Sequence, residues 1–169
     1  MNLIVPEYKT FMVTGKPVRR RLQRRILVDM PGDFKIRKPD DIKTLMTSFN
    51  IAINLNTVEH TYLICLDGTA APKGIFLISK GTVDRSAISP RDVIIAAMTL
   101  NCCNCILVHN HTFGTATPSE SDISFTTQTV KAMDACDMSL LDHCIVDTDG
   151  NLTSMRTTVP QCWEQCWQD

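Results

Sequence analysis

Two histidines and an aspartate have the types and spacing of a metal site. His109 and His111 stand at i and i+2 at the end of an apolar run, so their side chains project from one side of a strand. A Gly-, Pro- and Thr-containing loop then leads to Asp122 at a helix start, and this loop can bring the carboxylate to the same ion. Such a ligand set favours one zinc ion per chain, with another divalent metal left open. Three protein ligands leave a fourth position for water, which is typical of a catalytic site.

The same residues also allow a purely structural interpretation. Ser119-x-x-Asp122 is close to a helix capping box, in which both side chains only satisfy backbone N–H groups. A His-x-His pair beside an apolar strand is often packed against the core. The spacing alone therefore leaves both a metal site and a capped helix open.

The elements that must position these residues alternate along the chain. Apolar and β-forming runs predict strands, and residues at helical spacing behind Pro or Ser predict helices. The predicted strands are 58–66, 74–79, 105–108, 140–146 and a short one after Asp149-Gly150; the predicted helices are 39–49, one that opens at Ser89-Pro90, and 119–136. This order predicts an α/β or α+β protein, in which a mixed β-sheet is flanked by helices around one core.

The composition excludes several classes of protein. A chain of 169 residues with 44% hydrophobic and 21% charged residues is expected to form one compact domain. No apolar stretch approaches the roughly 20 residues of a membrane helix, and no signal-peptide core is found, so we expect a cytoplasmic protein with no membrane partner. The eight cysteines are then expected as free thiols, although Cys162 and Cys166 could pair or bind metal.

The net charge of −1 is unevenly distributed. Residues 1–43 carry a balance of +6, with Arg19-Arg20-Arg21 as the densest run, and the rest of the chain carries −7. A basic arm of this kind either contacts phosphates or an acidic partner, or is a flexible, solvated leader with nothing bound. Pro39 is the predicted hinge. We predict a basic N-terminal leader at 1–38, a domain at 39–157 and a C-terminal tail at 158–169.

The complete motif resembles a known family. His-x-His, seven residues, Ser, two residues and Asp is the JAMM motif of the JAB/MPN+ metalloproteases, here from His109 to Asp122. The local sequence is most similar to that of the RadC-like branch. The branch's H-N-H-P-S-G resembles His109–Gly114, its T-P-S and D match Thr117–Ser119 and Asp122, and its L-D-H matches Leu141–His143. Upstream, its H-P-R-E resembles Ser89–Asp92. The resemblance covers about Phe34 to Thr157. It implies a JAB/MPN-like, cytidine-deaminase-like sandwich, in a short form without the branch's helix-hairpin-helix region.

The resemblance also implies an activity. A zinc-activated water would attack a peptide or isopeptide-like amide bond in a peptide or protein substrate. Glu59, from the strand that ends in Leu66-Asp67, would act as the base, and Ser119 would help to stabilise the oxyanion. His143 would orient a ligand or pack in the core, and His60 would face the other side of its strand.

The chain departs from the branch pattern at Thr112-Phe113, which replaces Pro-Ser and places an apolar residue beside the site. Two other functions stay open. One is a catalytically inert MPN-fold binding module, which would lack metal. The other is a DNA-associated accessory protein of the RadC type, whose nucleic-acid binding would depend on salt and on the arginine leader.

Overall fold

The computed structural model describes residues 33–49, 51, 57–81 and 88–164, and the backbone of short strands at 12–13, 16–17 and 24–27. Strands β1 (Met12–Val13) and β2 (Lys16–Pro17) pair only with each other. The predicted Arg19-Arg20-Arg21 run and Cys166 lie outside the described residues.

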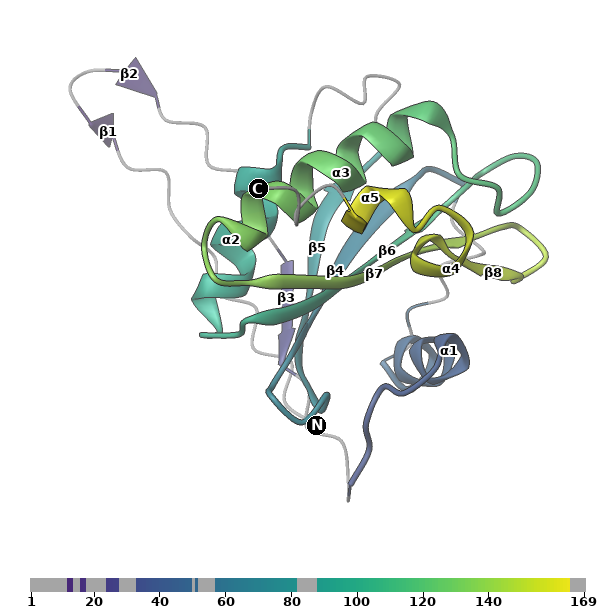
Figure 1. The fold of residues 1–169 in the computed structure, drawn as a ribbon, viewed down its shortest axis with the longest axis horizontal. Coiled ribbons are helices and arrows are strands. Elements are labelled where there is room, and N and C mark those ends of the chain that lie inside the picture. Colours follow the sequence, from purple (N-terminus) through teal and green to yellow (C-terminus); the bar gives the residue numbers. More distant parts are fainter. Residues whose placement is uncertain are drawn as a thin grey trace.

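A six-stranded mixed sheet forms the centre of the molecule, in the order β3-β5-β4-β6-β7-β8 (Figure 1). Its strands are β3 (Arg24–Leu27), β4 (His60–Leu66), β5 (Pro72–Lys80), β6 (Asn104–Asn110), β7 (Ser139–Val146) and β8 (Leu152–Ser154). All neighbours are antiparallel except β6 and β7, which are parallel. The predicted class, a mixed sheet flanked by helices, is therefore confirmed.

The three long helices begin where local chemistry favours a helix start. They are α1 (Pro39–Ser48), α2 (Pro90–Thr99) and α3 (Glu120–Asp134). Proline occupies the first position of α1 and α2, where its missing N–H costs nothing. In each first turn an aspartate accepts from the backbone N–H of the cap residue, as Asp92 does from Ser89 at 3.2 Å. Two short helices follow β8: α4 (Met155–Thr158) and α5 (Gln161–Glu164).

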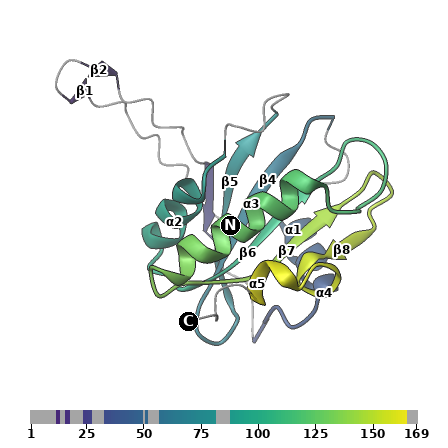
Figure 2. The same ribbon diagram turned by 45° about the horizontal axis from the view of Figure 1, so that its top comes forward.

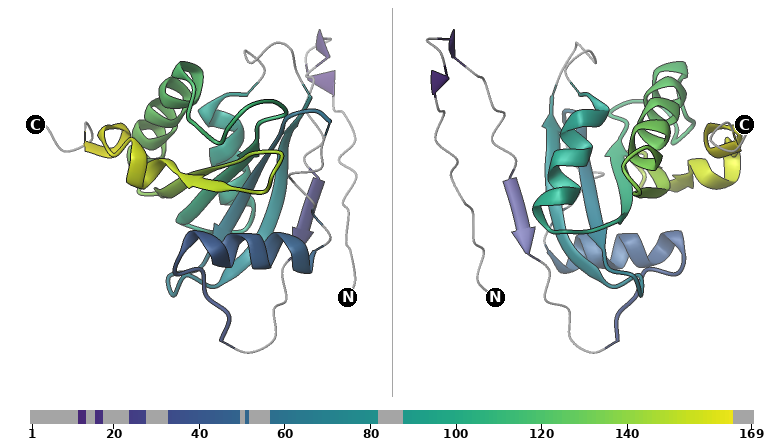
Figure 3. Two further views of the ribbon diagram at one scale, coloured as in Figure 1. Left: turned by 90° about the vertical axis from the view of Figure 1, so that its right-hand side faces the viewer. Right: turned by 60° about the vertical axis from the view of Figure 1, so that its left-hand side comes forward.

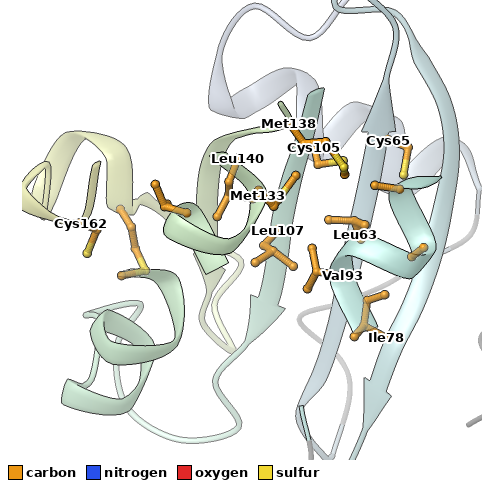
Figure 4. Close-up of a cluster of buried hydrophobic side chains, with 14 of the residues drawn as sticks. Leu63, Cys65, Ile78, Val93, Cys105, Leu107, Met133, Met138, Leu140 and Cys162 are labelled. Atoms are coloured by element: carbon orange, nitrogen blue, oxygen red, sulfur yellow. The ribbon is translucent and has the colours of Figure 1, made fainter. Parts of the chain in front are cut away.

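Side chains alternate between two hydrophobic cores, one on each face of the sheet. In β4, Leu63 and Cys65 enter one core, while Ile64 and Leu66 enter the other. The first core is covered by α2, α3 and α5, and Figure 4 shows its Leu63, Leu107 and Met133. The second is covered by α1, which lies across the sheet from α3 (Figure 3).

The crossover from β6 through α3 to β7 brings the candidate site residues together at the C-terminal end of β6. The chain leaves the C-terminal end of β6, enters α3 through residues 111–119, and returns through β7 parallel to β6 (Figure 2). Parallel strands require such a crossover. Because α3 starts close to the C-terminal end of β6, the residues before and after this loop lie together at that end of the strand.

Two of the elements outside the predicted domain of 39–157 join the central sheet or its first core. Strand β3 lies within the predicted leader and pairs antiparallel with β5. Helix α5 lies within the predicted tail, and its Cys162 and Trp163 are buried in the first core. The seven cysteines in the described part of the chain are free thiols. None of the described helices is long and apolar enough to cross a membrane.

Candidate metal centre

The two motif histidines lie side by side at the end of β6. His109 is the penultimate residue of the strand and His111 follows it directly. The His111 N–H donates to the Val146 carbonyl at 2.9 Å, which continues the pairing of β6 with β7 beyond the strand end. The rings are 5.0 Å apart between centroids, and the two residues are only 5% and 9% exposed. The alternation of a strand therefore places both imidazoles together, as predicted.

Asp122 reaches the same point from the first turn of α3. Ser119 caps this helix: its hydroxyl accepts from the Asp122 N–H at 3.3 Å, and its own N–H donates to Asp122 Oδ2 at 2.8 Å. The Ser119 hydroxyl also makes a short hydrogen bond to Oδ2. The capping box predicted as an alternative to the metal site is therefore present, and it fixes the carboxylate that the metal site needs.

The three donors lie close enough together to be candidate ligands of one ion. His109 Nε2 is 3.3 Å from Asp122 Oδ1, and His111 Nε2 is 3.3 Å from Asp122 Oδ2. All three candidate ligand atoms lie within 4.8 Å of one another. Zinc bonds of about 2.0–2.1 Å at a tetrahedral angle place neighbouring donors about 3.3–3.4 Å apart, which is the distance from each histidine to its nearer Asp122 oxygen. Two imidazoles and a carboxylate grouped in this way are a donor set that zinc accepts.

A buried chain of hydrogen bonds determines which nitrogen of His109 carries hydrogen. Thr126 Oγ1 is 2.6 Å from the Asp122 carbonyl, which can only accept, so the hydroxyl hydrogen lies there. His143 Nδ1, 2.7 Å from the same hydroxyl, must then be the donor. Its Nε2 is left to accept from His109 Nδ1 at 2.8 Å. This assigns the hydrogen of a neutral His109 to Nδ1 and leaves the Nε2 lone pair facing Asp122.

His111 is oriented in the same way by residues 111–119, the loop between β6 and α3. Its Nδ1 lies 3.0 Å from the Thr115 carbonyl, which can only accept, so Nδ1 carries a hydrogen. The Nε2 lone pair of neutral His111 therefore also faces Asp122. Both imidazoles present the same nitrogen to one point, each held by a partner behind it, which is the usual arrangement of histidine ligands.

The electrostatics of the cluster favour a protonated His111 and an ionised Asp122. The hydrogen bond to Asp122 raises the pKa of His111 despite the opposing effect of burial. Burial alone would raise the pKa of Asp122, but the hydrogen bonds from His111 and Ser119 and the charge on His109 lower it overall. Burial, reinforced by the neighbouring His109, lowers the pKa of His143 well below 6.5 and keeps this ring neutral.

A pocket of about 110 Å³ opens onto the cluster. Its lining residues are Glu59, Thr61, Ser79, Ile88, His109, Ser121, Asp122, Phe125 and His143. Glu59 lies one residue before β4, not inside the strand as predicted, and it is partly exposed. Its carboxylate nevertheless shares the pocket with two of the three candidate metal ligands.

The structure brings four of the predicted site residues to one place and adds others. Glu59, His109 and Asp122 line the pocket, His111 adjoins it through its contact with Asp122, and Ser119 lies behind Asp122 as its cap. Sequence reasoning missed Thr126, although its position four residues after Asp122 places it on the same helix face. It also missed Ser79 and Ser121, the two serines that line the pocket. Of the two roles considered for His143, the structure shows contact with a candidate ligand.

Known proteins are similar to this chain over the part that contains the candidate metal centre. A family model described as "RadC-like JAB domain" matches residues 36–159, a range that contains the whole cluster and Glu59. A UPF0758 protein from Finegoldia magna is 34% identical over 147 residues, which cover 87% of this chain and 63% of the relative. UPF0758 proteins from Marinomonas sp. and Cupriavidus taiwanensis are 47% identical over 66 residues (39% of this chain, 30% of the relative) and 32% identical over 133 residues (74% and 54%). The chain spans less than two thirds of the length of these curated relatives.

Proposed function

Because the chain belongs to the RadC-like JAB domain family, we propose that it is a metal-dependent hydrolase of the JAMM type that cleaves a peptide or isopeptide-like amide bond. The observation that carries this proposal is the shared pocket, in which Glu59 faces the same cavity as His109 and Asp122. In this proposal His109, His111 and Asp122 hold one zinc ion per chain. When bound, zinc lowers the pKa of a coordinated water and polarises a carbonyl.

The residues of the chain would divide the remaining work among them. Glu59 would take a proton from the attacking water and deliver it to the leaving nitrogen, because a single carboxylate can act first as base and then as acid. Ser119 would hold the Asp122 carboxylate and place its hydroxyl at the N-terminus of α3, where negative charge on the attacked carbonyl is favoured. Ser121, next to the helix start, lines the pocket together with Thr61 and Ser79, so hydroxyl groups are available there.

The pocket favours an uncharged amide over a phosphodiester. Its lining contains the carboxylates of Glu59 and Asp122, and none of the described residues that line it is Lys or Arg. Phosphate recognition normally uses such cations. Ile88 and Phe125 make part of the wall apolar, which suits a small uncharged group beside the bond to be cleaved.

The test combines metal content with hydrolysis. Untagged protein supplied with zinc is analysed for zinc per chain, and it is then incubated with a panel of peptides and isopeptide-linked conjugates that is read by mass spectrometry. We expect about one zinc in both the parent and Glu59→Gln, and a loss of cleavage of about 10²–10⁴-fold in Glu59→Gln, the usual contribution of a general base. The matched control is Glu120→Gln, an exposed glutamate in the first turn of α3.

Each result separates the proposal from its alternatives. Full activity of Glu59→Gln would remove Glu59 from the mechanism. A parent without zinc would instead favour the inert MPN-fold module, in which Ser119 and Asp122 serve only as a cap. The arginine leader remains a sequence-based argument for nucleic acid. DNA binding that falls steeply with salt and disappears on deletion of residues 1–23, which leaves β3 in place, would support a DNA-associated role.

A further inference from the structure

We infer that Asn110 is a positioning residue that fixes the backbone on both sides of Glu59 and so aims the Glu59 carboxylate at the metal cluster. The functional part of this inference rests on the role proposed for Glu59. Asn110 lies between the two metal-ligand histidines and is fully buried. Alternation along β6 turns its side chain away from both of them.

The Asn110 side chain makes two hydrogen bonds to the segment that carries Glu59. Its Oδ1 accepts from the His60 N–H at 2.8 Å, and its Nδ2 donates to the Val58 carbonyl at 3.3 Å. These two backbone groups belong to the residues immediately before and after Glu59. One amide side chain therefore holds both neighbours of the proposed base.

Two further contacts hold the same short segment. The Gly81 N–H donates to the Glu59 carbonyl at 2.7 Å, which continues the ladder between β4 and β5. His60 Nδ1 lies 2.9 Å from the Val58 carbonyl, so that carbonyl is shared by two side chains. The regular pairing of β4 with β6 begins only at Thr61, opposite His109. The side chain of Asn110 thus continues the hydrogen bonding between β6 and the β4 segment beyond their last paired residues. Glu59 lies between the two residues that Asn110 holds.

This geometry explains why an amide is required at residue 110. Leu would fill a similar volume but could make neither bond, and it would leave the buried His60 N–H without its acceptor. Asp would keep the acceptor for His60 and lose the donor for Val58. An Asn side chain satisfies one donor and one acceptor at once. Because the neighbouring ligands lie on the same strand, Asn110 links the position of the base to the position of the metal.

The test measures the position of Glu59 without requiring a known substrate. The probe is acetohydroxamic acid, an amide analogue that binds zinc and presents N–H and O–H groups to a nearby carboxylate. Its Kd is measured by calorimetry on zinc-loaded parent, Asn110→Leu, Glu59→Gln and the double variant, and zinc content is checked in each. Asn104→Leu, the same substitution at the other end of β6, is the control.

We expect one zinc in every variant and about 10-fold weaker hydroxamate binding in both Asn110→Leu and Glu59→Gln. If Asn110 acts through Glu59, the double variant will be no weaker than Glu59→Gln alone. Amide hydrogen exchange should also become faster at His60 and Gly81 in Asn110→Leu, while the amides of β4 from Leu63 onward stay protected. Asn110→Asp should lie between the parent and Asn110→Leu, which tests the inference if the leucine variant is poorly folded.

Additive losses in the double variant would overturn the inference, because they would show that Asn110 acts independently of Glu59. Unchanged hydroxamate binding in Asn110→Leu would overturn it as well, as would unchanged exchange at His60. Failure of the proposed function is separately visible: the parent would bind zinc and the hydroxamate but cleave no amide, and the Kd cycle would still report on Asn110.

Discussion

The substitution Thr126→Val tests the hydrogen-bond chain behind the metal cluster. Valine has nearly the shape of threonine, but it cannot accept from His143 Nδ1, which lies 2.7 Å from the threonine hydroxyl. A buried N–H left without a partner costs about 1–3 kcal/mol. His143 avoids this cost only by moving its hydrogen to Nε2, which then opposes the hydrogen on His109 Nδ1. The hydrogen of His109 would in turn be displaced to Nε2, the nitrogen that binds metal.

The expected result is a weaker metal site in a folded protein. Removing a partner that orients a histidine ligand typically lowers metal affinity 10- to 100-fold, which corresponds to about 1.4–2.7 kcal/mol. The assay is competition for zinc against a chromophoric chelator, with stability measured by urea unfolding of the metal-free protein.

The helix offers a matched control for this measurement. Thr129 is also fully buried on α3, and its hydroxyl donates to the Phe125 carbonyl at 2.8 Å, just as Thr126 donates to Asp122. Thr129→Val should therefore lose a comparable amount of stability, about 1 kcal/mol, and keep the parent's zinc affinity. Equal zinc affinities for the two variants would refute the assignment of hydrogens along the chain from Thr126 to His109.

Three further predictions concern the metal ligands and the C-terminal packing. Asp122→Ala should abolish zinc binding while costing only about 1–2 kcal/mol of stability through its lost cap; retained zinc in elemental analysis would contradict it. In the metal-free protein the raised pKa of His111 stabilises the fold fully below its unfolded value of 6.5, and this stabilisation is lost as pH rises through the folded pKa. The urea midpoint should therefore decrease as the pH rises from about 6 to 8, and it should decrease less in His111→Gln. Added zinc should reverse this pH dependence, because zinc displaces the proton. Trp163→Ala should cost about 3–5 kcal/mol, because the ring is buried and its Nε1 donates to the Leu140 carbonyl at 2.6 Å; a loss below 1 kcal/mol in urea unfolding would show that α5 adds little to the core.

The grouping of the three candidate ligands could be predicted because their geometry is local. Two residues at i and i+2 on a strand must share a face, and a capping residue must lie at a helix start. His109, His111 and Asp122 follow from these two rules and a short loop. Family resemblance added Glu59, whose contribution to the pocket depends on the pairing of β4 with β6, whose paired residues are 38 to 48 positions apart.

The remaining features depend on packing that spacing does not encode. The pairing of Leu107 with His143 is a consequence of the register between two parallel strands, and no local pattern determines that register. Thr126 and Asn110 act through contacts that exist only once α3 and β4 have been placed against β6. Trp163 falls within the predicted tail of 158–169, and tertiary contacts bury it in the first core.

The crossover from β6 to α3 has a consequence for the order in which the site is assembled. The three candidate metal ligands lie within the span 109–122, whereas Glu59 precedes β4, the strand that pairs antiparallel with β6. Closing a loop of this length costs little chain entropy, while bringing β4 beside β6 requires a contact of long sequence separation. The crossover can therefore bring the three candidate ligands together before β4 pairs with β6 and places Glu59 beside them.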